Sequence, residues 1–567
     1  MDNKSITRKL KLIIKLMELH DENPFKIRSY QNAVITMDRG GLDIAGIEQT
    51  ALQEIKGIGK SLAEVITTLV RTQTHPYLEE LLQKTPEGLL EVLQIKGLGP
   101  KKIKILWKEL NITSTHELME ACQSGQVAKL KGFGEKTQVG IVQAMEYTEA
   151  NKGKWLYAEL SQVVNTLDLL LERIFGKDKV ALTGEYARNI EIVDQLEWIL
   201  ESPDGRADFG QISQIPLLLV DLKLSSPFKW RGKIKDIGIA VVLHFTFPKL
   251  FTQTRLLRTG SRNHLLSPVG IENHTLASFF RSRSFESEHQ AYEEAGLGFI
   301  PAELREGQFE IEMAREGKIP LLLEMADLKG SLHNHSTYSD GKHSLREMAE
   351  HCKLLGYEYL GIADHSKSAF YAGGLDMDQV YKQQEEIIML NKELAPFRIF
   401  SGIESDILID GSLDYPDEGL ASFDFIVSSV HSSLSMNHQK ATRRLITAIE
   451  NPYTTILGHP TGRLLLRRDG YPIDHKSVID ACASKRVVIE INANPWRLDL
   501  DWKWVHYALE KEVKLSINPD AHEKEAFNDM KYGVLVGRKG GLTKEMTLNA
   551  LSSQELDNYF TNRKHQK

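Results

Sequence analysis

Residues able to bind metal ions are concentrated in the last part of the chain. The stretch SLHNHSTYSDG, residues 331–341, places His333 and His335 on alternate positions and Asp340 shortly after them. Further candidate ligands stand at the ends of short apolar runs: His365 in IADHS, Glu404 in GIES, His431 in SVHS, His459 in GHP, and Asp520 and His522 in PDAH. Imidazoles and carboxylates without a thiolate suit borderline divalent ions such as Mn²⁺, Zn²⁺ or Fe²⁺. Nine ligands are too many for one ion, so we predict two or three ions.

The surrounding sequence predicts how these ligands come together. The runs YEYLGIAD, FRIFSGIES, DFIVSSVHS, TILGHP, RVVIEINANP and VKLSINPDAH alternate with helical patterns, which is typical of repeated βα units. Parallel barrels place functional side chains at the carboxyl ends of their strands. A single histidine at such a position is more often structural. The alternating histidine pair and the Asp-x-His pair favour a metal centre instead.

The whole chain has the composition of a multidomain globular protein. Its 567 residues include 41% hydrophobic and 26% charged residues, which is ordinary for soluble proteins. No apolar run approaches the roughly 20 residues that span a bilayer, and the charged N-terminal segment reads as an amphipathic helix without signal-peptide features. Three widely separated cysteines predict neither a disulfide framework nor a zinc knuckle. We therefore expect a cytoplasmic protein.

Three related stretches recur in residues 1–150: IKGIGKSLAEVI, IKGLGPKKIKIL and LKGFGEKTQVGI. Each places two glycines before a helical pattern, so we expect the glycines to permit a tight turn and the next helix to present free N–H groups to a phosphate. The alternative is a plain packing turn between helices. Residues 1–150 contain 20 Lys and Arg and 19 Asp and Glu, so their net charge is nearly zero. Any DNA binding must therefore depend on local groups of positive charge and not on the net charge of the region. The predicted DNA-binding residues are Gly57, Gly59, Lys60, Gly97, Gly99, Lys101, Gly132, Gly134 and Lys136.

The middle of the chain has a different pattern. From residue 151, helical segments alternate with the β-rich runs KVALTGEY, LEWILES, IPLLLVDLKL and IGIAVVLHFTF. This pattern predicts a small α/β domain with a mixed sheet. A polar helical connector follows. The expected domains are therefore 1–150, 151–325 and 326–567.

The set HNHSTYSD, DHS, GIE, SVHS, GHPTGRL, EINANP and DAH resembles the polymerase and histidinol phosphatase (PHP) domain fused to bacterial family X DNA polymerases. All nine candidate ligands match that family. The resemblance implies a distorted (β/α)₇ barrel that holds up to three Mn²⁺ or Zn²⁺ ions and hydrolyses phosphoesters through activated water. We expect Arg463 of GHPTGRL and Arg497 of NPWRL to clamp phosphate, with surface ion pairs as the alternative.

The preceding regions resemble the rest of a family X polymerase: a lyase-like helical domain, hairpins and a nucleotidyltransferase palm. In TGEYARNIEIVDQLEWIL, Glu185 stands at the family's serine, Ala187 and Arg188 at its Arg pair, and Gln195 and Glu197 at two metal-binding aspartates. When the motif TGSRNH is aligned with the same motif of the family, the position of the family's third metal-binding aspartate falls at Val242. These residues supply too little negative charge for a Mg²⁺ pair.

An alternative remains for the palm. Asp194, Glu197 and Asp221 could form a rearranged carboxylate site, although neither aspartate is an easy substitute because a one-residue shift turns a strand side chain to the other face.

The resemblance also bears on lyase activity in the N-terminal region. The position of the family's Schiff-base lysine is occupied by Val65, with Lys60 nearby, so we do not expect the family's lyase chemistry at that position.

We therefore expect a DNA-directed, metal-dependent phosphoesterase. It would act as a 3′–5′ exonuclease, or on blocked 3′ ends and abasic sites, in DNA repair, on a polymerase scaffold with impaired synthesis. Its partner would be gapped, recessed or abasic DNA bound without sequence preference, near the nucleoid, and the chain would be a monomer. The alternatives are a working gap-filling polymerase with a proofreading exonuclease, a binding module with a structural metal site, and a small-molecule phosphatase.

Overall fold

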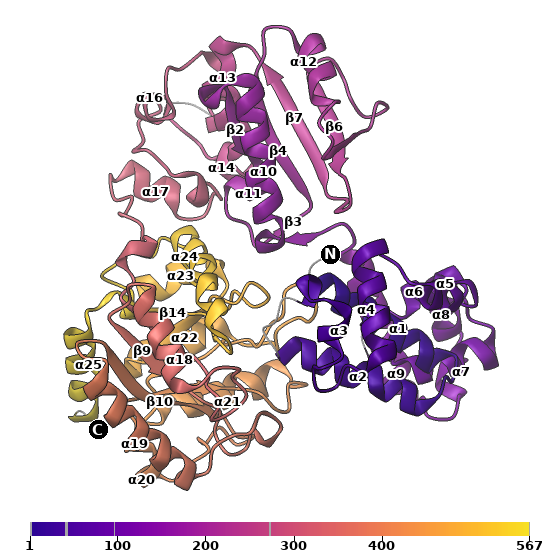
Figure 1. Ribbon diagram of the computed structural model, residues 1–567. Helices are drawn as coiled ribbons and strands as arrows, with labels where there is room; N and C mark the ends of the chain where they lie inside the picture. The colour runs from indigo at the N-terminus through magenta and orange to yellow at the C-terminus, as the bar shows by residue number, and fades with distance from the viewer. Residues whose placement is uncertain (1–2, 40–43, 96, 271–273, 566–567) are drawn as a thin grey trace. The chain divides into compact units, whose positions relative to one another are not determined.

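The computed structural model describes residues 3–39, 44–95, 97–270 and 274–565 (Figure 1). The chain forms two compact units, Met1–Lys152 and Gly153–Lys567. No helix among the described residues is long and apolar enough to cross a membrane.

The first unit is helical throughout its described residues. Its α-helices are α1 (Asn3–Leu19), α2 (Pro24–Arg39), α3 (Gln49–Leu52), α4 (Lys60–Thr72), α5 (Pro76–Gln83), α6 (Glu87–Val92), α7 (Pro100–Leu110), α8 (Thr115–Gln123) and α9 (Glu135–Ala150). The amphipathic α1 buries Ile6, Leu10, Ile13 and Met17, which recur at the spacing of one helix face. The glycine motifs precede α4, α7 and α9.

The second unit begins with a mixed five-stranded sheet, as the sequence predicts. The strand order is β2 (Val180–Thr183), β4 (Gln195–Glu201), β7 (Ala240–Thr246), β6 (Lys229–Ile234) and β5 (Leu218–Val220). β4 and β7 are parallel, and the other neighbours are antiparallel. β1 (Trp155–Leu156) and β3 (Ile192–Val193) pair separately. The sequence analysis missed β6 because KWRGKI contains no apolar run.

Four helices pack against this sheet: α10 (Tyr157–Phe175), α11 (Gly184–Ala187), α12 (Gly205–Ile212) and α13 (Phe251–Thr259). Four more form a separate hydrophobic core with α13: α14 (Arg262–Leu266), α15 (Leu276–Ser282), α16 (Glu288–Glu294) and α17 (Glu310–Arg315). The core between α10 and the sheet is closed by the fully buried Trp198 and Trp230.

The predicted barrel is confirmed by the rest of the second unit. Seven parallel strands run in chain order: β8 (Gly330–Ser331), β9 (Tyr359–Ile362), β10 (Arg398–Asp406), β11 (Phe425–Ser429), β12 (Ile456–Leu457), β13 (Val488–Asn492) and β14 (Leu515–Asn518). Beyond the last strand pair, a bridge between Asn334 and Ala521 nearly closes the ring. Every β10 residue after Arg398 is buried, as expected for a strand covered on both faces.

The connecting helices are α18 (Leu345–Leu354), α19 (Met377–Glu393), α20 (Asp417–Leu420), α21 (His438–Glu450), α22 (His475–Lys485), α23 (Trp502–Glu510), α24 (Met530–Lys539) and α25 (Ser553–His565). α18 packs on β9 and α19 on β10, on the outside of the barrel (Figure 1). This arrangement leaves the carboxyl ends of the strands to the intervening loops, where ligands are expected.

Candidate metal centre, hairpins and palm

The predicted ligands converge at the carboxyl ends of the barrel strands. His333 and His335 follow β8, His365 follows β9, Glu404 lies in β10, His431 follows β11, His459 follows β12, and Asp520 and His522 follow β14. Two of the ligand positions, His459 and Asp520, have positive φ angles of 21° and 54°. Such conformations are unfavourable for non-glycine residues and are often retained at functional sites.

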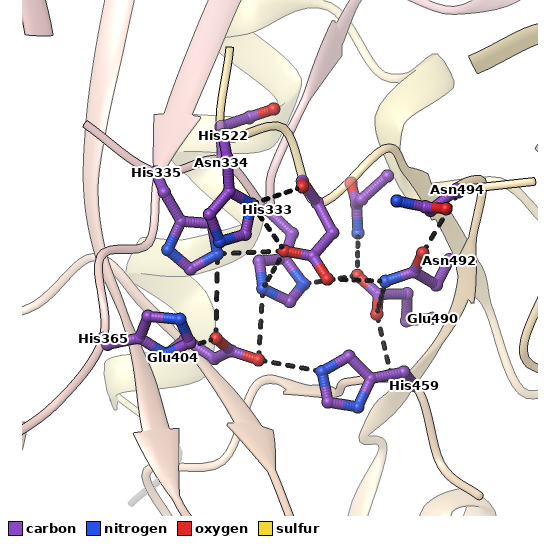
Figure 2. Close-up of polar contacts among 12 residues, drawn as sticks. His333, Asn334, His335, His365, Glu404, His459, Glu490, Asn492, Asn494 and His522 are labelled. Atoms are coloured by element: carbon purple, nitrogen blue, oxygen red, sulfur yellow. Dashed lines mark hydrogen bonds and ion pairs between the residues drawn. The ribbon is translucent and has the colours of Figure 1, made fainter. Parts of the chain in front are cut away.

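Glu404 is the central carboxylate of this cluster. Its Oε1 atom lies 3.0 Å from His459 Nε2 and 3.1 Å from His431 Nε2. Its Oε2 atom lies 3.0 Å from His365 Nδ1. Figure 2 shows Glu404 with His365 on one side and His459 on the other. Glu404 therefore connects histidines that come from three different strands.

Two aspartates connect the remaining histidines. Asp520 Oδ1 lies 3.0 Å from His335 Nε2, and Asp340 Oδ1 lies 3.3 Å from His522 Nε2. The donor atoms fall into three groups that could each hold a metal ion, and two histidines are shared between groups. The groups are His335, Asp340, His365 and His522; His333, His335 and Asp520; and His365, Glu404 and His431.

The donor atoms themselves fit divalent ions. Among the described residues, five buried donor atoms of the cluster make no contact with hydrogen-bond geometry, although some lie close to an oppositely charged group: His333 Nε2, His335 Nδ1, His365 Nδ1, Glu404 Oε2 and His459 Nδ1. A buried polar atom without a partner is costly. Because these atoms belong to residues of one cluster, and nitrogen and oxygen are the donors that Mn²⁺ or Zn²⁺ accepts, bound cations would remove much of this cost.

The carboxylates of the cluster are held in the ionised form. Burial opposes their charge, but the surrounding imidazoles lower the pKa of Glu404 and of Asp520 well below the usual values. Burial and the neighbouring His522 and His365 lower the pKa of His335 to about 3, so this imidazole is neutral. Ionised carboxylates and a neutral imidazole are the forms that bind metal ions.

Three further histidines have a raised pKa in the absence of a cation. Although burial opposes it, Glu490 and Glu404 raise the pKa of His333 well above its usual value. Although burial opposes the charge here too, Glu404 and Asp406 raise the pKa of His431 to about 10. Asp340 and Asp520 likewise raise the pKa of His522 to about 9. The protons of these imidazoles occupy the positions that a cation would take.

Two buried carboxylates outside the predicted set orient the histidines. Glu490 Oε1 lies 2.7 Å from His333 Nδ1, and Asp406 Oδ1 lies 2.5 Å from His431 Nδ1. Each leaves the Nε2 atom of its histidine directed toward Glu404. Carboxylates commonly fix metal-binding histidines in this way. Sequence reasoning missed both because their roles depend on hydrogen bonds to histidines that follow other strands.

The two predicted phosphate clamps lie in different environments. Arg497 is partly exposed and its Nε lies 3.6 Å from Asp520 Oδ2, beside the metal ligands. Arg463 instead donates to Glu191 at 3.0 Å, to Asp501 at 2.5 Å, and to the carbonyl oxygens of Arg497 and Leu498. The guanidinium of Arg463 is therefore fully engaged by protein groups, which matches the ion-pair alternative, although the ion pairs are largely buried.

The hairpin glycines have two different conformations. The first glycine of each motif has a positive φ: 99° at Gly57, 84° at Gly97 and 86° at Gly132. The second glycines, Gly59, Gly99 and Gly134, are extended N-cap residues of α4, α7 and α9. Our expectation that both glycines permit the turn was wrong, because only the first adopts the left-handed conformation. A Cβ atom on any second glycine would meet nothing within 4 Å, so each helix N-terminus is open to a ligand.

Basic residues accompany these helix starts unequally. Lys60 begins α4, and Lys101 lies in the first turn of α7. In the third motif Lys136 follows Glu135, which places a negative charge at the start of α9. An anion is favoured at a helix N-terminus, and a second negative charge opposes it. The first two hairpins are therefore more favourable to an anion than the third. Lys96 of the second motif lies outside the described residues.

A groove runs beside the first hairpin. It has a volume of ≈ 710 Å³ and is lined by residues that include Lys26, Tyr30, Lys56, Gly57 and Lys60. Val65, at the family's lyase position, is buried within α4, whereas Lys60 is exposed. The groove is therefore lined by lysines and a tyrosine, but the position expected for the family's lyase lysine holds Val65.

At the palm, the carboxylate of Glu197 is occupied by protein groups. Gln195 Nε2 donates to Glu197 Oε1 at 2.8 Å, and His244 Nε2 lies 3.0 Å from Glu197 Oε2. Sequence reasoning missed His244, which β7 places beside β4. Burial lowers the pKa of His244, which keeps the imidazole neutral at neutral pH. A single carboxylate thus stands between an amide and an imidazole.

The sheet register shows what surrounds this carboxylate. Val242 is the β7 residue directly opposite Glu197. Asp221 follows the edge strand β5, with β6 and β7 between it and β4, and its Oδ1 accepts from the backbone N–H of Lys223 and Leu224. Among the described residues, no group of three metal-type donors includes Asp194, Glu197 or Asp221. The structure thus gives no support to the rearranged carboxylate site.

Glu185 lies in α11, and Arg188 follows that helix directly. Burial and the charge of Asp194 raise the pKa of Glu185. Arg188 donates to Glu306 at 2.8 Å and to the carbonyl oxygen of Thr259 at 3.1 Å. The residue at the Arg-pair position therefore ties the end of α11 to the protein, and Ala187 has no charge to offer a triphosphate.

Comparison with known families identifies parts of the chain. Residues 1–75 match a helix-hairpin-helix domain, and residues 89–144 match a SAM-like helix-hairpin-helix tandem. Residues 331–494 match the PHP domain. The three hairpin motifs lie within the first two matches, and seven of the nine candidate ligands lie within the third, with Asp520 and His522 beyond its end.

Individual relatives extend the comparison to the whole length. The chain is 25% identical over 234 residues to a protein named "Probable phosphatase" of Thermoanaerobacter sp. (strain X514), covering 38% of this chain and 88% of that protein. It is 29% identical over 172 residues to a second "Probable phosphatase", of Caldicellulosiruptor bescii, covering 29% of this chain and 65% of that protein. It is 33% identical over 573 residues to "DNA polymerase/3′-5′ exonuclease PolX" of Bacillus subtilis (strain 168), covering 99% of both chains. Because this last similarity extends over almost the whole of both chains, this protein belongs to the PolX family, the bacterial family X DNA polymerases with a C-terminal PHP domain.

Proposed function

We propose that this protein is a DNA-directed, metal-dependent phosphoesterase, acting as a 3′–5′ exonuclease or on blocked 3′ ends and abasic sites during DNA repair. The observation that carries the proposal is the convergence of His333, His335, Asp340, His365, Glu404, His431, His459, Asp520 and His522 on one face of the barrel. The hairpins and the relationship to a relative named as a polymerase and exonuclease favour DNA as the substrate.

The residues of the site suit this reaction. Two or three Mn²⁺ or Zn²⁺ ions held by these ligands would supply a hydroxide near neutral pH and neutralise the charge of the phosphoryl oxygens. Glu490 and Asp406 keep the imidazoles of His333 and His431 oriented. Arg497, partly exposed beside Asp520, is placed to bind a phosphate oxygen.

The hairpins would hold the DNA by its backbone. The open N-termini of α4 and α7 present N–H groups that suit a phosphate of any sequence. This supports binding of DNA without sequence preference. With it we propose that the DNA is gapped, recessed or abasic and that the protein acts as a monomer in the cytoplasm.

We further propose that DNA synthesis by the palm is impaired. Two-metal nucleotidyl transfer needs several carboxylates around the ions. At this palm Glu197 is paired with His244 and Gln195, and Val242 stands opposite it. The same features argue against Mg²⁺ at the palm.

The test uses end-labelled gapped, recessed and abasic DNA with Mn²⁺, with and without dNTPs. We expect shortening of the 3′ end that is lost by orders of magnitude in Glu404→Gln, because that substitution removes the central charge of the cluster. The exposed Glu385→Gln on α19 is the matched control. Hydrolysis retained in metal-depleted Glu404→Gln would contradict the proposal.

One observation favours a second function. The barrel matches two proteins named as phosphatases, so hydrolysis of small phosphomonoesters is the alternative. It predicts turnover of small phosphomonoesters by the full chain and no shortening of any labelled DNA.

A further inference from the structure

Two aromatic side chains project from a short hairpin beside the metal ligands. Phe370 and Tyr371 are 85% and 65% exposed, although the flanking Ala369 and Ala372 are buried. They form the 3₁₀-helix η7 (Phe370–Ala372) within residues 366–375, which we call the aromatic hairpin. Adjacent exposed aromatic rings often mark a binding surface.

Both ends of the aromatic hairpin are fixed to the metal-ligand backbone. The N–H of Leu375 donates to the carbonyl oxygen of His365 at 2.9 Å, and the N–H of Ser366 donates to the carbonyl oxygen of Glu404 at 3.0 Å. Ser368 is held by Asp414, which accepts from its backbone N–H at 2.6 Å and from its hydroxyl at 2.5 Å. The hairpin is therefore a rigid extension of the site.

The hairpin also packs near Asp340. A Cβ atom on Gly373, whose φ is +70°, would lie 3.5 Å from the carbonyl oxygen of Ser339. Partial burial raises the pKa of Tyr371 to about 12, with contributions from Asp406, Glu404 and Asp340, whereas Arg497 opposes the rise. The Tyr371 ring is thus within electrostatic reach of the metal ligands and of Arg497.

The geometry of the two rings restricts the ligand. Their centroids are 6.2 Å apart and their planes are inclined by 77°, so they cannot present one flat surface to a large partner. A nucleobase needs only one ring face, and base–aromatic stacking works with any base. A small phosphomonoester held at the ions has no need of an apolar ring on the rim.

We propose that Phe370 and Tyr371 form a stacking site for an unpaired nucleobase at the 3′ end of the strand whose phosphate lies at the metal centre. This inference rests on the proposed exonuclease function. A base paired within a duplex is covered on both faces by its neighbours, so the site selects frayed, mispaired or single-stranded 3′ ends.

The test compares strands that end in a mispaired nucleotide with strands that end in a tetrahydrofuran abasic residue. In the full chain, we expect Phe370→Ala and Tyr371→Ala to lower kcat/KM about tenfold on the mispaired end and to leave the abasic end unchanged. Tyr381→Ala removes an aromatic side chain that is 49% exposed on α19 and serves as the matched control. Equal kcat/KM values for wild type and both hairpin variants on the mispaired end would overturn the stacking site, as would equal losses on both ends.

A binding measurement without added metal supplies a second readout. With 2-aminopurine at the 3′ end, stacking on the hairpin should change the fluorescence with wild type and Tyr381→Ala, and Phe370→Ala should reduce the change. A wild-type protein that hydrolyses no DNA end contradicts the proposed function. Hydrolysis and fluorescence changes that are identical in the hairpin variants contradict only the stacking site.

Discussion

The carboxylate of Glu490 lies 2.7 Å from Nδ1 of His333, and both side chains are fully buried. The same carboxylate accepts from the backbone N–H of His459 at 2.8 Å and from the amide of Asn518 at 3.0 Å. One residue that is not itself among the predicted ligands thus positions ligands that follow two different strands.

We predict that Glu490→Gln lowers metal affinity about 10- to 100-fold, because an amide cannot accept all of these hydrogen bonds. Calorimetric titration of the metal-free protein with Mn²⁺ measures the change, with Glu385→Gln as control. Unchanged affinity in a folded Glu490→Gln protein would show that His333 does not depend on this contact.

Metal binding should release protons. The pKa of His431 is raised to about 10 and that of His522 to about 9, so at pH 8 both imidazoles of the metal-free protein are charged. A cation must displace these protons, and its affinity should therefore rise as the pH rises toward 10. Calorimetry at pH 8 in two buffers with different ionisation enthalpies measures the proton release. His522→Gln should reduce it by about one proton, and heats that are independent of the buffer would contradict the prediction.

Most barrel ligands could be predicted because they lie at or just after an apolar run that forms a strand. An apolar run followed by His, Asp or Glu gives both the strand and the position of the side chain, and the parallel barrel then brings the strand ends together. Glu490 and Asp406 could not be predicted in this way, since their roles depend on hydrogen bonds to His333 and His431, which belong to other strands.

Arg463 and the hairpin glycines show a second limit. The motif GHPTGRL indicates that Arg463 follows a ligand strand, but not that Glu191 and Asp501 surround it. Likewise, KGLG does not reveal which glycine has the positive φ, because this depends on where the following helix begins. In the structure Gly97 makes the turn and Gly99 caps α7.

This distinction gives a clean test of the hairpins. The φ of Gly99 is −76°, which suits any residue, so Gly99→Val leaves the turn unstrained and blocks close approach to the N-terminus of α7. We predict that affinity for DNA of any sequence falls about three- to tenfold at fixed salt, as measured by fluorescence anisotropy. Gly140→Val, on the exposed face of α9 and also without a neighbour within 4 Å of its added Cβ, is the matched control. Equal affinities for the two variants would favour the packing-turn alternative.

The last prediction is that this protein extends primers poorly. In the alignment expected from the sequence, Gln195, Glu197 and Val242 replace three metal-binding aspartates, and β4 and β7 place Glu197 and Val242 directly opposite each other. Loss of one comparable transition-state ligand commonly lowers a rate by roughly 10²- to 10³-fold, and such losses need not add. We therefore expect extension of gapped DNA near background in a His335→Ala, Glu404→Ala protein, in which degradation cannot mask synthesis. Raising the dNTP concentration should not restore extension, because Glu185 adds negative charge where the triphosphate would bind.

The matched control for this prediction adds Glu197→Ala to the same background. Robust templated extension that disappears with Glu197→Ala would show that Glu197, despite its contacts with His244 and Gln195, still supports nucleotidyl transfer.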